Sequence, residues 1–408
     1  MSDAPSQRPC SDRRSEDDRH ASAGTSSYGR QVLRRTLAQW TARLGLLWIG
    51  LLVVMAVFAP FLANSHPLLL GEQGHFQSPL IEHLTPTDVI LLVAFFGTLI
   101  TALVPIRLAA KLSVWLSILA VASALSFAFV SPPKITVYEQ YREAQLQGRF
   151  SWVLLTPIPY SPKDYLRDVD DSGLKPPLVD PERKHWLGTE MNGADVLSHL
   201  IYASRIALGI GFVATGIAMA IGIIVGGLMG YFSGTLDIIG MRLVEIFESV
   251  PTLFLLLTFV AFFGRSLYIM MVIIGITGWP IYARYIRAEF LKLREQEFVQ
   301  SAIACGIPLP SLLFRHLLPN GLAPVLVAAS FGVASAILAE ATLSFLGLGL
   351  VDEPSWGQML NQAVQSATFN WWLAAFPGGA IFLTVFAYNL IGEALRDAID
   401  PFLHRPSN

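Results

Sequence analysis

Residues 206–231 read IALGIGFVATGIAMAIGIIVGGLMGY, an apolar stretch without a single charged side chain. A helix needs about 20 apolar residues to cross a bilayer, so this stretch is long enough to span one. Small residues recur at every fourth position, which places them on one helix face: Ala214, Ala218, Gly222, Gly226, Gly230 and Gly234. A face without large side chains lets a second helix approach closely. We therefore interpret Gly222, Gly226 and Gly230 as helix-packing positions inside a bundle.

The composition of the whole chain agrees with a membrane protein. Of its 408 residues, 53% are hydrophobic and 14% are charged, and the mean hydropathy is +0.53. Average soluble domains carry about 25% charged residues, so one large soluble enzyme is excluded. The formal net charge of −2 argues against nucleic-acid binding. Cys10 and Cys305 have no partner at metal-ligand spacing, and the sequence has no G-x-x-x-x-G-K-[ST] phosphate loop, so we expect no metal and no cofactor.

About eight apolar segments predict an all-α polytopic membrane protein. They lie at about residues 44–63, 88–104, 112–130, 206–231, 244–263, 267–283, 322–346 and 371–391. Residues 1–43 are polar and have no apolar period, so we expect a disordered cytoplasmic tail there. N-terminal transmembrane helices would follow at 44–130, an extracytoplasmic loop at 131–205 and a transmembrane core at 206–402.

Basic residues are distributed unevenly between the two sides of this arrangement, as the positive-inside rule requires. With an inside N-terminus, the short inside loops hold Arg107, Lys111, Arg242, Arg284, Arg287, Lys292, Arg294 and Arg315. The short outside loops 64–87 and 347–370 contain no Lys or Arg. Segment 131–205 is Pro-rich and carries basic residues, but long loops cross the membrane largely regardless of charge. We therefore expect a cell inner membrane protein with both termini in the cytoplasm and an extended or partly helical outer cap.

Acidic residues inside apolar spans need a partner or a watery path. Glu340 lies deepest, and two interpretations stay open for it: a pathway or gate residue, or an acid satisfied by hydroxyls such as those of Thr342 and Ser344. Other acids lie nearer an interface, where we expect them to be solvated or paired with Arg242 and Arg396: Glu245, Glu248 and Glu393.

The histidines do not have the spacing of metal ligands on a helix. His66, His75 and His83 cluster in the first outer loop, and His185 and His199 lie further along the chain. We therefore expect solvated surface histidines.

Residues 284–320, RYIRAEFLKLREQEFVQSAIACGIPLPSLLFRHLLPN, are too polar to span a membrane and too regular for a linker. Apolar positions recur at helical spacing: Phe298, Ala302 and Cys305. Gly306 ends this helix, and a second short helix is predicted from after Pro310 to Pro319. The pattern fits a docking element for a soluble partner and equally an amphipathic helix on the lipid surface.

The spacing of this segment resembles the cytoplasmic loop of ATP-binding-cassette (ABC) importer permeases, whose pattern is E-A-A-x3-G-x9-I-x-L-P. Every interval is kept, at positions Gln300, Ser301, Ala302, Gly306, His316, Leu318 and Pro319. The first two letters differ, and His316 replaces an apolar residue. The ending RHLLPN is typical of the dipeptide/oligopeptide/nickel branch of the family. The resemblance makes these seven residues the predicted ATPase-coupling loop.

Further blocks extend the resemblance over about residues 185–402, in the family's order. They are HWLGTEMNGADVLSHLIYASRIAL, GWPIYARYIRAEFLKLREQEFV, ATLSFLGLGL, PSWGQML and NLIGEALRDAIDP. They are similar to the second, C-type permease, which implies a type I fold with one leading helix and a five-helix core. Residues 88–130 and 131–184 depart from it by an extra helix pair and a longer outer loop.

The resemblance implies a transport subunit rather than an enzyme. The implied partners are a second permease subunit in a heterodimer, cytoplasmic ATP-binding subunits, an extracytoplasmic substrate-binding protein and the lipid bilayer. The substrate would be a peptide or a related small solute. ATPase closure would move the short helix around residues 301–310, and Gly306→Asp is expected to abolish uptake while the protein stays in the membrane.

An ion-coupled secondary transporter is the alternative function. It would need paired broken helices in two related halves of the chain. The sequence has Pro251, Pro280 and Pro324 but no such halves. A membrane-bound enzyme would need a nucleophile with its base, or a metal pair, and the sequence offers neither.

Overall fold

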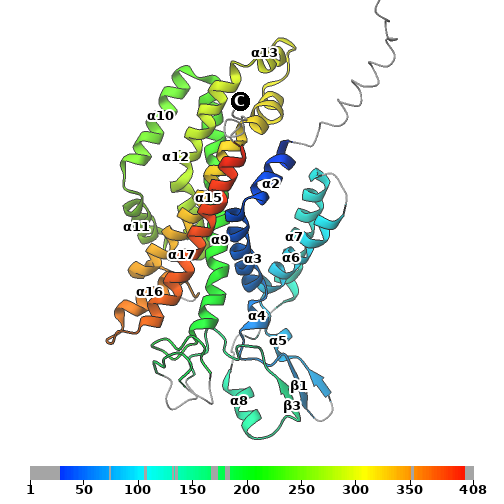
Figure 1. Cartoon of the computed structure of the whole chain (residues 1–408), viewed down its shortest axis with the longest axis vertical. Helices are drawn as coiled ribbons and strands as arrows, with labels where there is room; N and C mark the ends of the chain where they lie inside the picture. The colour runs from blue at the N-terminus through cyan, green and yellow to red at the C-terminus, as the bar shows by residue number, and fades with distance from the viewer. Residues whose placement is uncertain are drawn as a thin grey trace, which may run out of the picture.

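The computed structural model describes residues 28–399 except 73–74, 105–107, 131–132, 134–136, 167–172, 180–183 and 351–352. Long helices run along the length of an elongated molecule (Figure 1). The main helices are α2 (Tyr28–Ala38), α3 (Trp40–Val57), α6 (Pro86–Leu103), α7 (Leu108–Phe129), α9 (Val196–Phe232), α10 (Gly234–Ser249), α11 (Thr252–Phe263), α12 (Leu267–Arg294), α15 (Leu318–Leu343) and α17 (Trp371–Ile399). Shorter ones are α4 (Ala59–Leu62), α5 (Pro79–Glu82), α8 (Glu139–Leu146), α13 (Glu297–Ala304), α14 (Leu309–Ser311) and α16 (Trp356–Gln365).

The prediction of an all-α polytopic membrane protein is confirmed. Among the described residues, 6 helices are long and apolar enough to cross a membrane, and a bent pair would make up to 7. α7 adds a shorter apolar stretch at Ser113–Phe129. About eight spans therefore agree with the structure. The end that carries α13 and the end that carries α8 lie at opposite ends of the long axis, and are called here the α13 end and the α8 end (Figure 1).

The span predicted at residues 244–263 is not one straight helix. α10 ends at Ser249, α11 begins at Thr252, and the two helices are bent by 83°. Pro251 lies at the break, and a proline disfavours helical backbone in the residue before it. The apolar composition therefore located the span but not its bend.

The prediction that residues 1–43 lack structure is wrong for residues 28–43, which form α2 and the start of α3. Residues 1–27 lie outside the described part. Val32 and Thr36 on α2 are buried, and α2 packs on α17. An isolated helix of this length is marginal in water, so tertiary packing stabilises a segment that its composition alone marks as polar.

The core forms where α9 lies against α12, with α15, α17 and α3 around them. A Cβ on Gly222 would lie 2.4 Å from the Cβ of Tyr282, and one on Gly226 would lie 2.3 Å from the carbonyl oxygen of Ala283. On Gly230 it would lie 2.7 Å from the Arg287 carbonyl oxygen. The three glycines therefore allow α9 and α12 to approach backbone to backbone.

The α6–α7 pair stands beside α3 (Figure 1) and contacts the core at few places. Thr85 and Asp88 form a capping box at the start of α6. The other carboxylate oxygen of Asp88 accepts a hydrogen bond from Arg205 on α9 at 2.6 Å, and Arg205 also donates to the Ala56 carbonyl of α3 at 2.6 Å. Arg205 thus joins α3, α6 and α9, a link that the sequence did not reveal.

A small antiparallel sheet forms the α8 end, and no strand was predicted there. Its strand order is β2-β1-β3, from β1 (Leu69–Glu72), β2 (His75–Gln77) and β3 (Trp152–Leu154). It joins the first outer loop to the Pro-rich segment. Arg142 adds a two-bonded ion pair to Asp164, at 2.7 and 3.1 Å. The predicted cap is therefore partly helical, through α8, but its two sequence segments are also paired by backbone hydrogen bonds.

Three of the histidines predicted to be solvated are buried: His66, His185 and His199. Nδ1 of His185 faces the Asp195 carboxylate at 2.9 Å, and His199 lies between the Glu190 carboxylate and the Pro162 carbonyl. Asp195 also accepts a hydrogen bond from the Ser198 backbone N–H as N-cap of α9. This cap starts α9 ten residues before the predicted residue 206, so His199 belongs to the helix. The carboxylate partners lie only nine or ten residues away, but spacings of nine and ten residues do not by themselves indicate a contact, so the prediction failed.

Candidate functional site

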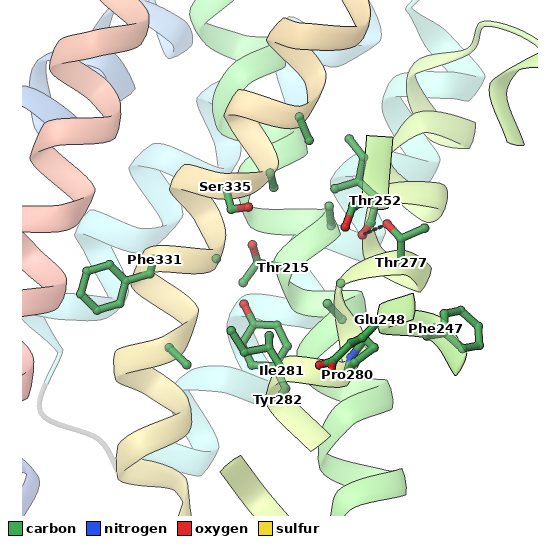
Figure 2. Close-up of a pocket in the computed structure, with 18 of the residues that line it drawn as sticks. Thr215, Phe247, Glu248, Thr252, Thr277, Pro280, Ile281, Tyr282, Phe331 and Ser335 are labelled. Carbon is green, nitrogen blue, oxygen red and sulfur yellow. Dashed lines mark hydrogen bonds between the residues drawn. The ribbon is translucent and has the colours of Figure 1, made fainter. Parts of the chain in front are cut away.

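A cavity of about 380 Å³ lies between α9, the α10–α11 pair, α12 and α15. Residues lining it include Thr215, Glu248, Thr277, Tyr282, Phe331 and Ser335. Figure 2 shows the side chains of Thr215, Tyr282 and Ser335 directed into the space between these helices. Most other lining residues are apolar. The lining therefore combines apolar walls with a few hydroxyl groups, the composition of a site that accepts a small solute.

Tyr282 approaches α15 at the position of a glycine. A Cβ on Gly332 would lie 1.8 Å from the Tyr282 hydroxyl oxygen, so only glycine leaves room for this ring. The Thr215 hydroxyl is buried and has no hydrogen-bond partner among the described residues. A buried hydroxyl without a partner is costly, so Thr215 can hydrogen-bond water or a solute that enters the cavity.

Two acidic residues of α10 are paired with arginines. Arg242 donates to Glu245 at 2.5 Å, as expected, but Glu248 pairs with Arg284 of α12 rather than with Arg242. Glu248 also lines the cavity (Figure 2). One acid at the cavity wall is therefore tied to the segment that leads toward α13.

Glu340 is 2% exposed and lies outside the cavity lining. Ser344 donates a hydrogen bond to its carboxylate at 2.6 Å, one helical turn further along. The hydroxyl of Thr342 instead donates to the Leu338 carbonyl. Of the two interpretations left open for Glu340, the geometry favours an acid satisfied by a neighbouring hydroxyl, and Ser344 supplies it.

The turn after α13 is built around Gly306. Its φ is +71°, in the left-handed region that favours glycine. The Gly306 N–H donates to the Ile303 carbonyl at 2.9 Å, and the Ile307 N–H donates to the Ala302 carbonyl at 3.2 Å. These two bonds form a Schellman motif, which satisfies the last carbonyls of α13. A Cβ on Gly306 would meet no atom within 4 Å, so the constraint is backbone conformation rather than space.

The buried face of α13 differs from the predicted one. Val299 and Ala302 are buried, whereas Phe298 is 44% exposed and Cys305 is also exposed. The two exposed residues were predicted on the apolar face with Ala302. Helical spacing gives several possible faces, and packing against α12 selects the one through Val299. Gln300 and Ser301 are exposed, and the Gln300 side chain donates to the Arg294 carbonyl at 2.8 Å.

The second short helix does not end at Pro319. The chain is helical from Leu309 to Leu348, through the π-helical segment η1 (Leu312–Leu317), α15 and the π-helical segment η2 (Ser344–Leu348). Pro319 is the second residue of α15, directly after the π-helical segment, and has no N–H to donate to the preceding turn. The wider turns of η1 accommodate the proline ring without ending the helix. His316 and Leu318 therefore lie on a helix that continues into the span.

One buried cluster connects α13 to the cavity. Its members come from α13, η1, α12, α9 and α15: Val299, Ala302, Leu312, Leu317, Ile286, Phe290, Tyr282, Ala218, Val325 and Ala328. Of these, Tyr282, Ala218 and Ala328 also line the cavity. Close-packed interiors transmit displacement, so movement of α13 reaches the cavity wall through side chains in contact.

Two arginines of α12 tie it to the α9–α10 turn. Arg287 forms a two-bonded ion pair with Asp237 on α10. Arg294 donates to the Tyr231 carbonyl at 3.0 Å and to the Ser233 hydroxyl at 2.8 Å. From the sequence, both arginines were predicted only to be part of the basic charge on the inside. The charged Asp237 at the start of α10 was the available signal in the sequence.

Solved structures with a similar chain include an inward-facing form of the MetNI methionine ABC transporter. It shares 20% identity, covers 50% of this chain and 98% of that chain, and has a TM-score of 0.43.

Family comparisons match two regions of the sequence. Residues 222–405 match the binding-protein-dependent transport system inner membrane component family. Residues 27–79 match the N-terminal transmembrane domain of oligopeptide transport permease C.

Curated relatives resemble this chain over more than half of its length. A dipeptide transport system permease protein of Alkalihalophilus pseudofirmus is 39% identical over 55% of this chain and 74% of that relative. An oligopeptide transport system permease protein of Haemophilus influenzae is 39% identical over 54% of this chain and 71% of that relative. The ion-coupled alternative receives no support. The chain therefore belongs to the binding-protein-dependent transport system inner membrane component family and is a C-type permease subunit of an ABC importer.

Proposed function

We propose that this permease imports peptides, with the cavity between α9, α12 and α15 on the substrate path. The curated relatives above are named for dipeptide and oligopeptide transport, which supports this substrate class. The hydroxyl groups of Thr215, Tyr282 and Ser335 can replace water around a peptide backbone without fixing its side chains. Such a lining fits a permease whose substrate choice is made by a separate binding protein.

The α13 end faces the cytoplasm in this proposal, and the α8 end faces outward. The basic residues Arg284, Arg287 and Arg294 lie toward the α13 end of α12. α2 and the end of α17 lie at the same end of the molecule (Figure 1). An excess of Lys and Arg favours the cytoplasmic side, which supports inside termini. The segments around α8 and the small sheet then form the extracytoplasmic cap, where a substrate-binding protein would dock.

Coupling runs from an ATP-binding subunit into α13. Family membership implies such a subunit, together with a substrate-binding protein. Its docking surface would be the exposed side of α13 with Gln300, Ser301 and Ile303, and the Gly306 turn beside it. Val299 and Ala302 on the other side enter the cluster that reaches the cavity wall. This continuous packing is the observation that carries the proposal, because it turns a push on α13 into movement of Tyr282.

A second permease subunit would complete the path. α10 and α11, which border the cavity, carry exposed apolar side chains such as Ile246 and Phe254. A face of this kind next to the cavity suits a second permease, and the C-type match supports a heterodimer.

Reconstitution tests the function directly. We expect the tagged chain to copurify with a second permease and an ATP-binding subunit. Proteoliposomes containing this complex should take up a labelled dipeptide or oligopeptide only with the binding protein outside and hydrolysable ATP on the α13 side. Uptake driven by an ion gradient without ATP would contradict the coupling. ATP-dependent uptake of another solute, without peptide uptake, would contradict the substrate class alone.

A further inference from the structure

α2 is an amphipathic helix outside the spans, at the α13 end. Val32 and Thr36 are buried, and α2 packs on α17. Its other side exposes Leu33 at 59% and Leu37 at 42%. Arg34 is exposed next to these leucines, and Arg35 is exposed on the other flank of α2. One helix face therefore presents apolar and cationic groups together, away from the core.

A hollow of about 520 Å³ lies where α2 meets α3. It is lined by Leu33, Arg34, Leu37, Ala38 and Arg43. Arg43 donates to the Leu37 carbonyl at 2.7 Å, which holds the guanidinium group beside the hollow and caps the end of α2. Among the described residues, neither Arg34, Arg35 nor Arg43 has a carboxylate within ion-pair distance. The lining of the hollow thus combines cationic and apolar side chains, and the described part of the chain supplies no counter-charge to it.

The apolar face of α2 continues into the membrane-facing side of α3. Trp40 is 70% exposed, Leu44 52% and Leu47 69%, and they follow α2 directly along the chain. Tryptophan is enriched at the boundary between head groups and acyl chains. We therefore expect Trp40 at this boundary, which would place the hollow at the level of the lipid head groups.

We propose that the hollow between α2 and α3 binds the phosphate head group of an anionic phospholipid, with its acyl chains along the apolar face of α3. Arg34 and Arg43, which line the hollow, complement the negative phosphate, and Arg35 adds positive charge on the neighbouring flank of α2. The leucines match the start of the acyl region. Basic residues beside a span are attracted to anionic lipids, each contributing a roughly fivefold preference near the surface. A soluble protein partner fits less well, because the exposed face runs without interruption into the lipid-facing side of α3.

Native mass spectrometry of the full chain, taken from nanodiscs of mixed phosphatidylglycerol and phosphatidylcholine, tests the proposal. We expect phosphatidylglycerol to be retained in preference to phosphatidylcholine. The double variant Arg34→Gln/Arg35→Gln should weaken that preference about 10- to 30-fold. The control Arg242→Gln/Arg265→Gln removes the same charge from α10 and the α11–α12 turn and should retain the lipid. Equal loss in both variants, or no loss in either, would overturn the site.

Two further arms separate the sources of binding. In the first, the variant Leu33→Ser/Leu37→Ser keeps the arginines and should weaken phosphatidylglycerol retention. In the second, inorganic phosphate at millimolar concentration is added to the wild-type chain and should not displace the lipid. Displacement by phosphate would show an anion site without a lipid, and would overturn the proposal. Absence of enrichment in the assembled transporter would show that a protein subunit covers α2 instead, and would also overturn it.

Discussion

Arg287 of α12 and Asp237 of α10 face each other with two hydrogen bonds, one of them 2.6 Å between Nη2 and Oδ2. The two residues are 50 positions apart, and their pairing fixes the start of the bent α10–α11 span to the helix that leads into α13. A displacement of α12 therefore carries α10 with it, and both helices border the cavity.

Asp237→Asn should partly uncouple uptake from ATP hydrolysis. The variant removes the charge partner of Arg287, and hydrogen bonds to charged groups contribute about 1.5–3 kcal/mol. We expect ATP hydrolysis to continue while peptide uptake per ATP falls. The measurement is uptake and phosphate release in the same proteoliposomes.

The exposed pair Arg242–Glu245 is the matched control for this prediction. Exposed ion pairs contribute under about 1 kcal/mol to stability, so Arg242→Gln should leave the ratio of peptide uptake to ATP hydrolysis unchanged. The charge-exchange variant Asp237→Arg/Arg287→Asp should restore part of the uptake per ATP that Asp237→Asn loses. A ratio in Asp237→Asn equal to the wild-type ratio would remove this pair from the coupling path.

Gly306→Val should reduce uptake without removing the protein from the membrane. The left-handed conformation costs a non-glycine residue about 1–2 kcal/mol, and a β-branched residue tolerates it least. Gly306→Asn should retain most uptake, because asparagine adopts this conformation more readily. Transport assays with membrane levels measured by immunoblot compare the two.

The comparison of uptake between Gly306→Val and Gly306→Asn is the informative result. A Cβ at Gly306 meets no atom within 4 Å among the described residues, so a clash of that atom with them does not explain the effect. The loss of uptake expected for Gly306→Asp then combines backbone strain with a new charge at the docking surface. Equal activity of the Val and Asn variants would show that the backbone conformation at Gly306 is not required.

Gly226→Ala should destabilise the packing of α9 on α12. The added Cβ would lie 2.3 Å from the Ala283 carbonyl oxygen, so the helices must separate. Overpacking of this kind costs about 1–3 kcal/mol. We expect a lower melting temperature of the purified protein in detergent.

Gly216→Ala on the same helix is the control, since its Cβ would meet nothing within 4 Å. Alanine is the better helix former, so this variant should melt at the wild-type temperature or slightly above it. A Gly226→Ala variant as stable as Gly216→Ala would show that the close approach is not needed.

Acid should destabilise the α8 end through His66. Burial, and repulsion from a charged His83, lower the pKa of His66 from 6.5 to about 4, although Asp164 acts in the opposite direction. Between these two values the unfolded chain takes up a proton that the folded chain does not. Stability from the neutral ring is therefore complete above about pH 6.5 and decreases as the pH falls toward 4, by up to about 3 kcal/mol.

Melting temperatures of wild type and His66→Phe between pH 4 and 7 check this prediction. The phenyl ring keeps an aromatic group against His83, whose ring centroid lies 3.8 Å from that of His66, but does not titrate. Its melting temperature should therefore fall less on acidification. His75→Gln, at an exposed strand position, should follow the wild type. Parallel curves for wild type and His66→Phe would contradict the assignment.

The sequence by itself determined the class of protein and the location of its spans. Apolar length and charge asymmetry depend only on local composition, which is why 206–231 and the other apolar runs could be recognised without a structure. The spacing from Gln300 to Pro319 pointed to the proposed coupling segment for the same reason, because it is a local pattern.

Only the tertiary structure decided which residues meet. Asp237 and Arg287, or Asp88 and Arg205, are joined by the way α10, α6 and α9 pack, and no local pattern records such contacts. Packing also selected Val299 rather than Phe298 as the inward side of α13, and turned polar residues 28–38 into a helix against α17. Burial and ion pairing depend on groups far apart in the chain, so they become visible only when the helices are assembled.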